Sequence, residues 1–332
     1  MQKISRDVLL EKAGSLLRDN TVSSVLGWRA GEFGYDVTPS LFTDVEDLNQ
    51  NFVWNDFCGA NFSKYLVKES RAAEGKVLVF LKPCDTYSFN QLLTEHRFDR
   101  EKGYAVGIPC EGMLDVNRIK AVAGEGVVSI EETDDALLVT TLYEDAPVRV
   151  SYADALAERC QNCKSRRHVA YDELLGDEGE VLDSARFDEV ERLEAMTPDE
   201  RFAFWQNELS RCIRCNACRD VCPACTCEKC VFDNPTSGVE NKAATNSFEE
   251  KMFHIIRAFH VAGRCTDCGE CSRVCPQNIP LHLLNRKFIK DINTFWGDYQ
   301  AGAEVGSRAP LVDYTTEDLE PGEIFDGRDG NA

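Results

Sequence analysis

The chain has 332 residues and is strongly acidic, with 57 Asp and Glu against 37 Lys and Arg and a formal net charge of −20. This length allows two domains with separate cores, and the charge argues against nucleic acid or an anionic membrane as a partner. No apolar run approaches the roughly 20 residues of a membrane-spanning helix, and no apolar leader follows Met1, so we expect a cytoplasmic protein that does not insert into a membrane.

The N-terminal part of the chain predicts an α/β domain. A capped amphipathic helix is expected over about residues 5–20. The clearest element is the wholly apolar run 77–81, Val-Leu-Val-Phe-Leu, which is typical of a buried strand. A turn over 82–85 leads from it into a helix expected over 86–96.

A second strand is expected over 104–108, so the strand-helix-strand crossover makes the two strands parallel. Cys84 and Cys110 follow the carboxyl ends of these strands, and we therefore expect both at the same edge of the sheet, where open parallel sheets place their sites. Farther along, the apolar segments 127–130 and 137–142 predict a hairpin.

The second half of the chain predicts helices. Thr197 is an N-cap candidate followed by Pro at the first helical position and by Glu200 of a capping box. Further helices are expected over 247–261 and 280–296. The fold class is therefore α+β, with an N-terminal α/β domain that holds a small, partly parallel sheet and a mostly helical C-terminal domain. We expect four regions: the α/β domain (1–175), an acidic connector (176–197), the helical domain (198–300) and an acidic, extended tail (301–332).

Two cysteine runs, 212–223 and 265–276, dominate the helical domain. Each reads Cys, two residues, Cys, two residues, Cys, three residues, Cys, Pro. This is the ligand pattern of bacterial [4Fe–4S] ferredoxin sites, in which the fourth Cys of each run ligates the other cluster. The predicted ligands are Cys212, Cys215, Cys218 and Cys275 for one cluster, and Cys265, Cys268, Cys271 and Cys222 for the other.

Zinc and disulfides are the alternatives for so many cysteines. A structural zinc site needs neither the repeated triplet nor the displaced fourth cysteine, and a disulfide scaffold does not suit a chain without a secretory leader. Two [4Fe–4S] clusters are therefore favoured. Because Arg214 lies in the first run while Asp267 and Glu270 lie in the second, we expect the first cluster to have the higher potential, unless solvent screens these charges.

Eight of the 16 cysteines lie outside the eight predicted ligands. Four of them occupy turn positions and are expected to hold a third [4Fe–4S] cluster, with Cys58 as a substitute ligand; without a cluster they would be ordinary buried thiols. These four are Cys84, Cys110, Cys160 and Cys163. Three more fit either packing or an accessory metal: Cys225, Cys227 and Cys230. His254 and His260 are expected to be surface or cavity residues and not ligands.

These residues stand in a set of short segments: Asn55-Asp-Phe-Cys58, Lys82-Pro-Cys84-Asp85, Gly107-Ile-Pro-Cys110-Glu-Gly112, Cys160-x-x-Cys163, Cys212-Ile-Arg-Cys215-x-Ala-Cys218-Arg and His260-Val-Ala-Gly263-Arg-Cys265. Together they resemble the iron–sulfur beta subunits of coenzyme F-420 (deazaflavin) hydrogenases and formate dehydrogenases. An iron–sulfur component of anaerobic sulfite reductase is a more distant look-alike. The resemblance covers about residues 50–295.

The resemblance implies an iron–sulfur electron-transfer subunit of a cytoplasmic, anaerobic oxidoreductase complex of the formate dehydrogenase, hydrogenase or heterodisulfide reductase type. Such a subunit relays single electrons between a flavin-containing partner and a catalytic subunit. The alternative is a flavoenzyme that binds FAD and itself oxidises or reduces a soluble deazaflavin or nicotinamide carrier, with Lys82, Arg166 and Arg167 binding phosphates or carboxylates. No Gly-x-Gly-x-x-Gly follows a strand, and no acid–base pair or nucleophile stands out, so no catalytic residue is expected.

Overall fold

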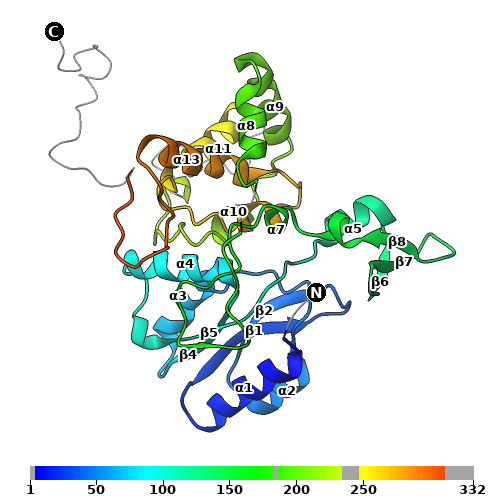
Figure 1. Cartoon of the computed structure of the whole chain (residues 1–332), viewed down its shortest axis with the longest axis vertical. Coiled ribbons are helices and arrows are strands. Elements are labelled where there is room, and N and C mark those ends of the chain that lie inside the picture. Colours follow the sequence, from blue (N-terminus) through cyan, green and yellow to red (C-terminus); the bar gives the residue numbers. More distant parts are fainter. Residues whose placement is uncertain (1–3, 183–184, 234–246, 311–332) are drawn as a thin grey trace.

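In the computed structural model of the chain, residues 4–182, 185–233 and 247–310 are described, the side chains of 247–251 excepted. Figure 1 shows an α/β domain at one end, a helical domain at the other, and a small arm that projects from the side between them. The α+β fold class predicted from the sequence is confirmed. No helix in the described ranges is long and apolar enough to cross a bilayer. The tail beyond residue 310 lies outside these ranges.

The α/β domain is built on a six-stranded sheet in the order β2-β1-β4-β5-β9, with β3 also pairing with β1. The strands β1, β4, β5 and β9 are parallel to one another, whereas β2 and β3 run antiparallel to β1. The predicted parallel pair is therefore confirmed. The strands are β1 (Ser24–Ala30), β2 (Val37–Phe42), β3 (Phe52–Val53), β4 (Val77–Leu81), β5 (Gly103–Gly107) and β9 (Glu173–Leu174).

Helices cover both faces of this sheet, which explains why every residue of β4 is apolar and buried. In Figure 1, α1 and α2 lie below the sheet, while α3 and α4 lie between the sheet and the helical domain. A short 3₁₀ turn, Arg100–Lys102, leads into β5. The helices are α1 (Arg6–Arg18), α2 (Val45–Asn51), α3 (Ser63–Ala72) and α4 (Pro83–Thr94).

Helix α4 corrects one expectation, because it begins at Pro83 and not at Thr86. Lys82 occupies the N-cap, Pro83 is the first helical residue, and the side chain of Asp85 accepts a hydrogen bond from the backbone N–H of Lys82. The segment expected as a turn is thus the first turn of the helix. Cys84 consequently sits at a helix N-terminus, directly after the carboxyl end of β4.

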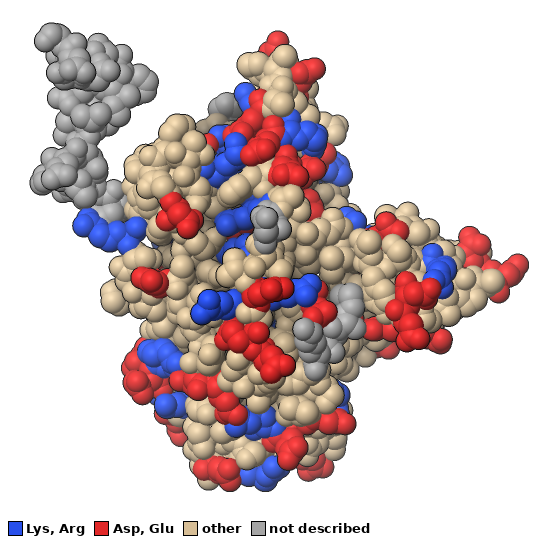
Figure 2. Space-filling view, in the orientation of Figure 1, with Lys and Arg blue, Asp and Glu red and all other residues tan. Residues whose placement is uncertain are grey.

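The projecting arm is a three-stranded antiparallel sheet with a helix packed against it. The predicted hairpin over 127–142 is confirmed as β6 and β7, and β8 is an added strand that the sequence did not indicate. Acidic side chains gather at the tip of this arm in Figure 2. Its elements are α5 (Val116–Ala123), β6 (Val127–Glu132), β7 (Ala136–Thr141) and β8 (Val148–Ser151), and two short helices follow them, α6 (Tyr152–Ala155) and α7 (Glu158–Gln161).

The helical domain begins within the expected acidic connector. Helix α8 packs against α13 through Val190, Leu193 and Leu283, so this part of the connector belongs to the helical core. A 3₁₀ turn, Val231–Asp233, follows the first cysteine run. The helices are α8 (Asp188–Ala195), α9 (Pro198–Ser210), α10 (Ala217–Asp220), α11 (Ser247–His260), α12 (Glu270–Arg273) and α13 (Leu281–Phe295).

Candidate iron–sulfur centres

The two cysteine runs fold into the same tight loop. Arg214 and Asn216 in the first run have φ of 54° and 63°, and Asp267 and Gly269 at the matching positions of the second have φ of 57° and 67°. Left-handed backbone is uncommon for residues other than glycine and costs free energy, so its recurrence at equivalent positions indicates a shared functional geometry. Each loop then ends in a one-turn helix, α10 or α12.

The loops bring the predicted ligands of the first cluster together. These four cysteines line one small cavity of about 20 Å³, and Cys275 reaches it from the second run: Cys212, Cys215, Cys218 and Cys275. His254 contributes an Nε2 atom 3.2 Å from the sulfur of Cys212. Burial lowers the pKa of His254 to about 3, so its ring is neutral and hydrogen-bonds the predicted ligand.

The predicted ligands of the second cluster are also neighbours. Cys222, the fourth cysteine of the first run, lies close enough for the charge of its thiolate to raise the pKa of all three cysteines of the second triplet. These three are Cys265, Cys268 and Cys271. Burial raises the pKa of Cys265 to about 12, and it does the same for Cys218 in the first set. These thiols hold their protons until a metal displaces them.

One buried arginine of α11 lies between the two sets, and sequence reasoning missed it. Arg257 is only 3% exposed, and the ionisable groups around it are the thiols of Cys271, Cys218 and Cys222, whose charge outweighs the effect of burial and raises its pKa. Its Nη1 atom is buried without a hydrogen-bond partner. The signal in the sequence was an arginine four residues after Phe253, on the buried face of the helix.

The acids on which the expected order of potentials was based do not act as free charges, because four arginines pair with them. Asp267 lies 2.9 Å from Arg186 and 3.0 Å from Arg286, all three being buried or nearly so. Glu270 is fully buried and pairs with Arg159 and with Arg273.

Burial alone would raise the pKa of Glu270, but these two guanidinium groups outweigh it and lower the pKa to about 2. The second loop is therefore not the more negative one. In the first loop, Arg214 is buried, with its guanidinium 4.2 Å from the ring centre of Phe253.

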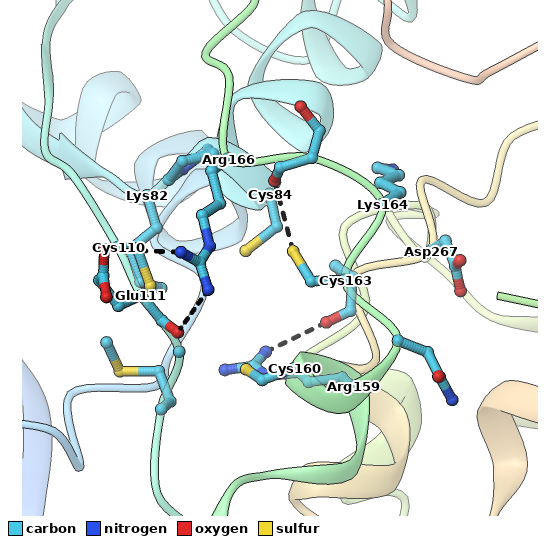
Figure 3. Close-up of a pocket in the computed structure, with 16 residues that line it drawn as sticks. Lys82, Cys84, Cys110, Glu111, Arg159, Cys160, Cys163, Lys164, Arg166 and Asp267 are labelled. Atoms are coloured by element: carbon cyan, nitrogen blue, oxygen red, sulfur yellow. Dashed lines mark hydrogen bonds and ion pairs between the residues drawn. The ribbon is translucent and has the colours of Figure 1, made fainter. Parts of the chain in front are cut away.

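A third set of cysteines converges at the edge of the α/β sheet, as expected. They come from the first turn of α4, the segment after β5, and α7 with the loop behind it, and they face one enclosed pocket of about 50 Å³ (Figure 3). Cys268 of the second cluster run also lines this pocket. The four are Cys84, Cys110, Cys160 and Cys163.

Burial raises the pKa of Cys84, Cys110 and Cys163, that of Cys110 to about 12. Cations balance this set, since Arg159 and Lys164 line the same pocket. Burial lowers the pKa of Lys164 to about 8.

Cys58 is not among the lining residues: it is fully buried and its sulfur lies near Asn55 and the carbonyl of Val53. The prediction of Cys58 as a substitute ligand is therefore not supported by its position.

Of the three cations expected to bind phosphates or carboxylates, Lys82 and Arg166 line the pocket at the sheet edge and Arg167 does not. Lys82 is fully buried, and its ammonium lies 2.7 Å from Asp85 and donates to the carbonyl of Ala60. Arg166 lies on the pocket wall, where it is paired with Glu111, while Arg167 is exposed and outside the lining. Lys82 does not fit a flavin phosphate, because Asp85 already neutralises its charge inside the protein.

The remaining cysteine triplet lies apart. Cys225, Cys227 and Cys230 line a wider cavity of about 610 Å³, next to His260 of α11. Across the described ranges, no three Cys, His, Asp or Glu side chains are close enough to hold one metal ion.

Comparison with known proteins places these sites in context. Residues 208–279 match the family model of the 4Fe–4S dicluster domain. The chain is 22% identical to the F420-dependent formate dehydrogenase subunit beta of Methanocaldococcus jannaschii, over 83% of this chain and 86% of the relative. It is 23% identical to the F420-dependent formate dehydrogenase 1 subunit beta of Methanococcus maripaludis, over 89% and 92%.

A structure of the F420-reducing [NiFe] hydrogenase complex from Methanosarcina barkeri, derivatised with xenon, contains a chain that matches with 13% identity and a TM-score of 0.33. The match covers 62% of this chain and 88% of that one. The sequence relatives and the domain match confirm the resemblance predicted from the sequence.

Proposed function

Proceeding from its dicluster domain and its similarity to F420-dependent formate dehydrogenase beta subunits, we propose that this chain is a cytoplasmic electron-transfer subunit of a formate dehydrogenase, hydrogenase or heterodisulfide reductase-like complex. It relays single electrons between a flavin-containing partner and a catalytic subunit. In this proposal the thiols of the two runs hold two [4Fe–4S] clusters, and the pocket at the sheet edge holds a third.

The observation that carries the proposal is the continuity of the three thiol sets. Cys268 belongs to the second run and also lines the pocket of the α/β domain. On the other side, Cys271 of the second run acts electrostatically on Cys218 of the first. The second set therefore adjoins both the pocket at the sheet edge and the first set, and we call this arrangement the row of thiol sets. A merely structural metal site would not require such adjacency.

The outer end of this row reaches the surface. Cys215 is exposed, and the neighbouring Ile213 is 60% exposed. An apolar side chain beside an exposed ligand suits a partner that docks over this end of the row and exchanges electrons there. The opposite end is the enclosed pocket beside β4 and β5, so the two ends of the row face different parts of the molecule.

Iron–sulfur clusters supply one-electron transfer, and the residues of this chain control where and how easily it occurs. Cys84, Cys110 and their partners fix the position of the proposed third centre. Arg257 and Arg159 provide positive charge in buried surroundings, where it favours the more negative, reduced state.

The test is the composition of the full chain purified without oxygen. We expect iron and acid-labile sulfide in equal amounts, [4Fe–4S] signals by EPR after reduction, and no stoichiometric flavin. A colourless protein, or zinc in place of iron, would overturn the proposal. Stoichiometric flavin together with reduction of a deazaflavin or nicotinamide carrier by the isolated chain would favour the flavoenzyme alternative.

The third centre can be tested separately with the double variant Cys84→Ser/Cys163→Ser. We expect it to lose about four irons per chain relative to the wild type, because it removes two of four ligands, while the dicluster EPR signals remain. Cys58→Ala is the matched control, since it removes a buried thiol outside the pocket and should leave the iron content unchanged. An unchanged iron content in the double variant would exclude this centre.

A further inference from the structure

One group of thiols is used by none of the three sets above. Cys225, Cys227 and Cys230 lie within six residues of chain that directly follow the first cysteine run, and all three line the same cavity of about 610 Å³. This cavity is wide and open, unlike the small cavity of the first set. The three thiols on this cavity wall are soft ligands of the kind that iron–sulfur clusters take.

Cations and acids both line this cavity, and two of its arginines are paired: Arg219 with Asp220 and Asp233, and Arg264 with Glu95. Lys64 reaches across from α3 and donates to the carbonyl of Cys225, while Arg264 donates to the carbonyl of Ala224 at 3.0 Å. Both cations lie close enough to the thiols of Cys225 and Cys227 to interact with their charge. A metal cluster held by thiolates is negatively charged, so these side chains stabilise it.

A buried, unpartnered donor points to the same occupant. Arg257 also lines this cavity, and its Nη1 atom has no hydrogen-bond partner although the side chain is only 3% exposed. Leaving a buried charged donor unsatisfied is costly, and such a group normally has a partner. An anionic cluster in the cavity would supply acceptors that the protein itself does not.

The triplet is also connected to the proposed relay. The thiol of Cys225 is hydrogen-bonded to Cys222, which belongs to the second predicted cluster. The side chains of Cys222, Cys225 and Cys265 pack in one cluster with Val261. An occupant bound to Cys225 therefore lies immediately beside the dicluster.

We propose that Cys225, Cys227 and Cys230 hold a further iron–sulfur cluster. It would lie beside Cys222 and exchange electrons with the second cluster of the proposed relay. A polynuclear cluster suits thiols that surround a wide cavity, whereas one zinc ion needs four tightly converging ligands. One electron passes from the neighbouring cluster, which is oxidised by one unit, to this centre, which is reduced by one, and no bond or proton is exchanged. This electron transfer rests on the proposed relay, but the metal content of the site does not.

The experiment compares the full-length wild type with the triple variant Cys225→Ser/Cys227→Ser/Cys230→Ser, both purified without oxygen. We expect the variant to contain about four fewer irons and four fewer sulfides per chain, and a smaller EPR spin count after reduction, while the dicluster signals persist. Cys58→Ala again serves as the control with unchanged iron.

Two results would overturn the inference. An unchanged iron and sulfide content in the triple variant overturns the inference, as does the loss of zinc in place of iron. If the triple variant does not fold, Cys227→Ser replaces it, because this thiol is exposed and the hydrogen bond to Cys222 comes from Cys225. This variant must then show the same loss of EPR signal. Failure of the relay itself would appear differently, as missing dicluster signals in the wild type.

Discussion

Single buried charges set the properties of the proposed centres. The acids of the second cysteine run, Asp267 and Glu270, contact arginines that come from α13, α7, α12 and the segment before α8. Their charge is therefore neutralised largely by residues remote in sequence, the exception being Arg273, which lies three residues after Glu270 in α12. Arg257 differs from these arginines, because the charges near it are the thiols of the cysteine runs.

We predict that Arg257→Met lowers the midpoint potential of at least one dicluster centre. Removing a buried cation near an anion disfavours the reduced state, by on the order of 50 mV for an interaction of roughly 1 kcal/mol. EPR-monitored redox titration measures the shift, and Arg257→Lys should restore most of it. Arg211→Met is the control, since Arg211 flanks the same run but is exposed and paired with Glu208. A potential that is unchanged or raised in Arg257→Met would contradict the assignment.

His282 makes stability depend on pH. Its Nδ1 atom shares a hydrogen bond of 2.8 Å with the hydroxyl of Ser272, and burial beside Arg286 lowers its pKa from 6.5 to about 4. Because the folded pKa lies below the unfolded one, the stabilisation is complete above pH 6.5 and is lost as the pH falls toward 4.

We therefore expect the wild type to lose about 2 kcal/mol relative to His282→Gln between pH 7.5 and pH 5. Thermal unfolding at the two pH values measures the difference. A difference between the two proteins that stays constant with pH would show that His282 does not titrate in this way.

At the scale of elements, the strands and helices of the α/β domain place the thiols of the third set. Strands β4 and β5 run parallel, so Cys84 and Cys110 reach the same sheet edge. Strand β1 lies next to β4 and is less evident in the sequence, because Gly27 and Arg29 interrupt its apolar pattern. Gly27 is required in this strand because the rings of Phe52 and Phe42 pack closely against it.

We predict that Gly27→Ala destabilises the α/β domain. A methyl group there would lie 2.8 Å from the ring of Phe52 and 3.2 Å from that of Phe42, and both rings are buried. Overpacking of this kind costs about 1–3 kcal/mol, which thermal unfolding would detect as a lower Tm. Gly34→Ala is the matched control, because no atom lies within 4 Å of the added methyl group. Equal Tm values for the two variants would show that the rings move aside freely.

At the scale of the whole molecule, buried polar contacts join the α/β domain to the cluster loops. Glu270 accepts a hydrogen bond from the backbone N–H of Asn61, and Arg159 donates to the carbonyls of Gly59 and Cys268. Ser88 of α4 and Thr266 share a hydrogen bond of 2.8 Å. The pocket at the sheet edge and the second cysteine run are therefore held in a defined relation, which a relay between them requires.

We predict that Glu270→Gln loosens this junction. Removing the charge leaves Arg159 and Arg273 without their anionic partner, and breaking a buried ion pair costs about 3–5 kcal/mol. A lower Tm and faster proteolysis between the domains are expected. Asp135→Asn, which breaks the exposed pair with Arg149 on the arm, should change neither. A Glu270→Gln protein as stable as the wild type would contradict the role of this contact.

Local sequence was sufficient for the parts of the molecule that depend on short spacing. The two cysteine runs, the strand at Val77–Leu81 and the capping box at Thr197 each lie within a dozen residues, so their geometry follows from chain connectivity and local hydrogen bonding. The helix α4 was placed three residues late, since Lys82 is not a usual N-cap residue.

Only the tertiary structure decided which remote groups meet. It placed Arg257 among the thiols and paired the acids of the second loop with four arginines. It also paired Lys82 with Asp85 inside the protein, and it placed Cys58 outside the pocket that Cys268 lines. Apart from the pairs of Glu270 with Arg273 and of Lys82 with Asp85, such contacts arise from tertiary packing, and no spacing within one segment encodes them. The sequence by itself thus predicted which thiols hold the proposed clusters, whereas the fold decided how these thiols are grouped, which charges surround them and which of them are exposed.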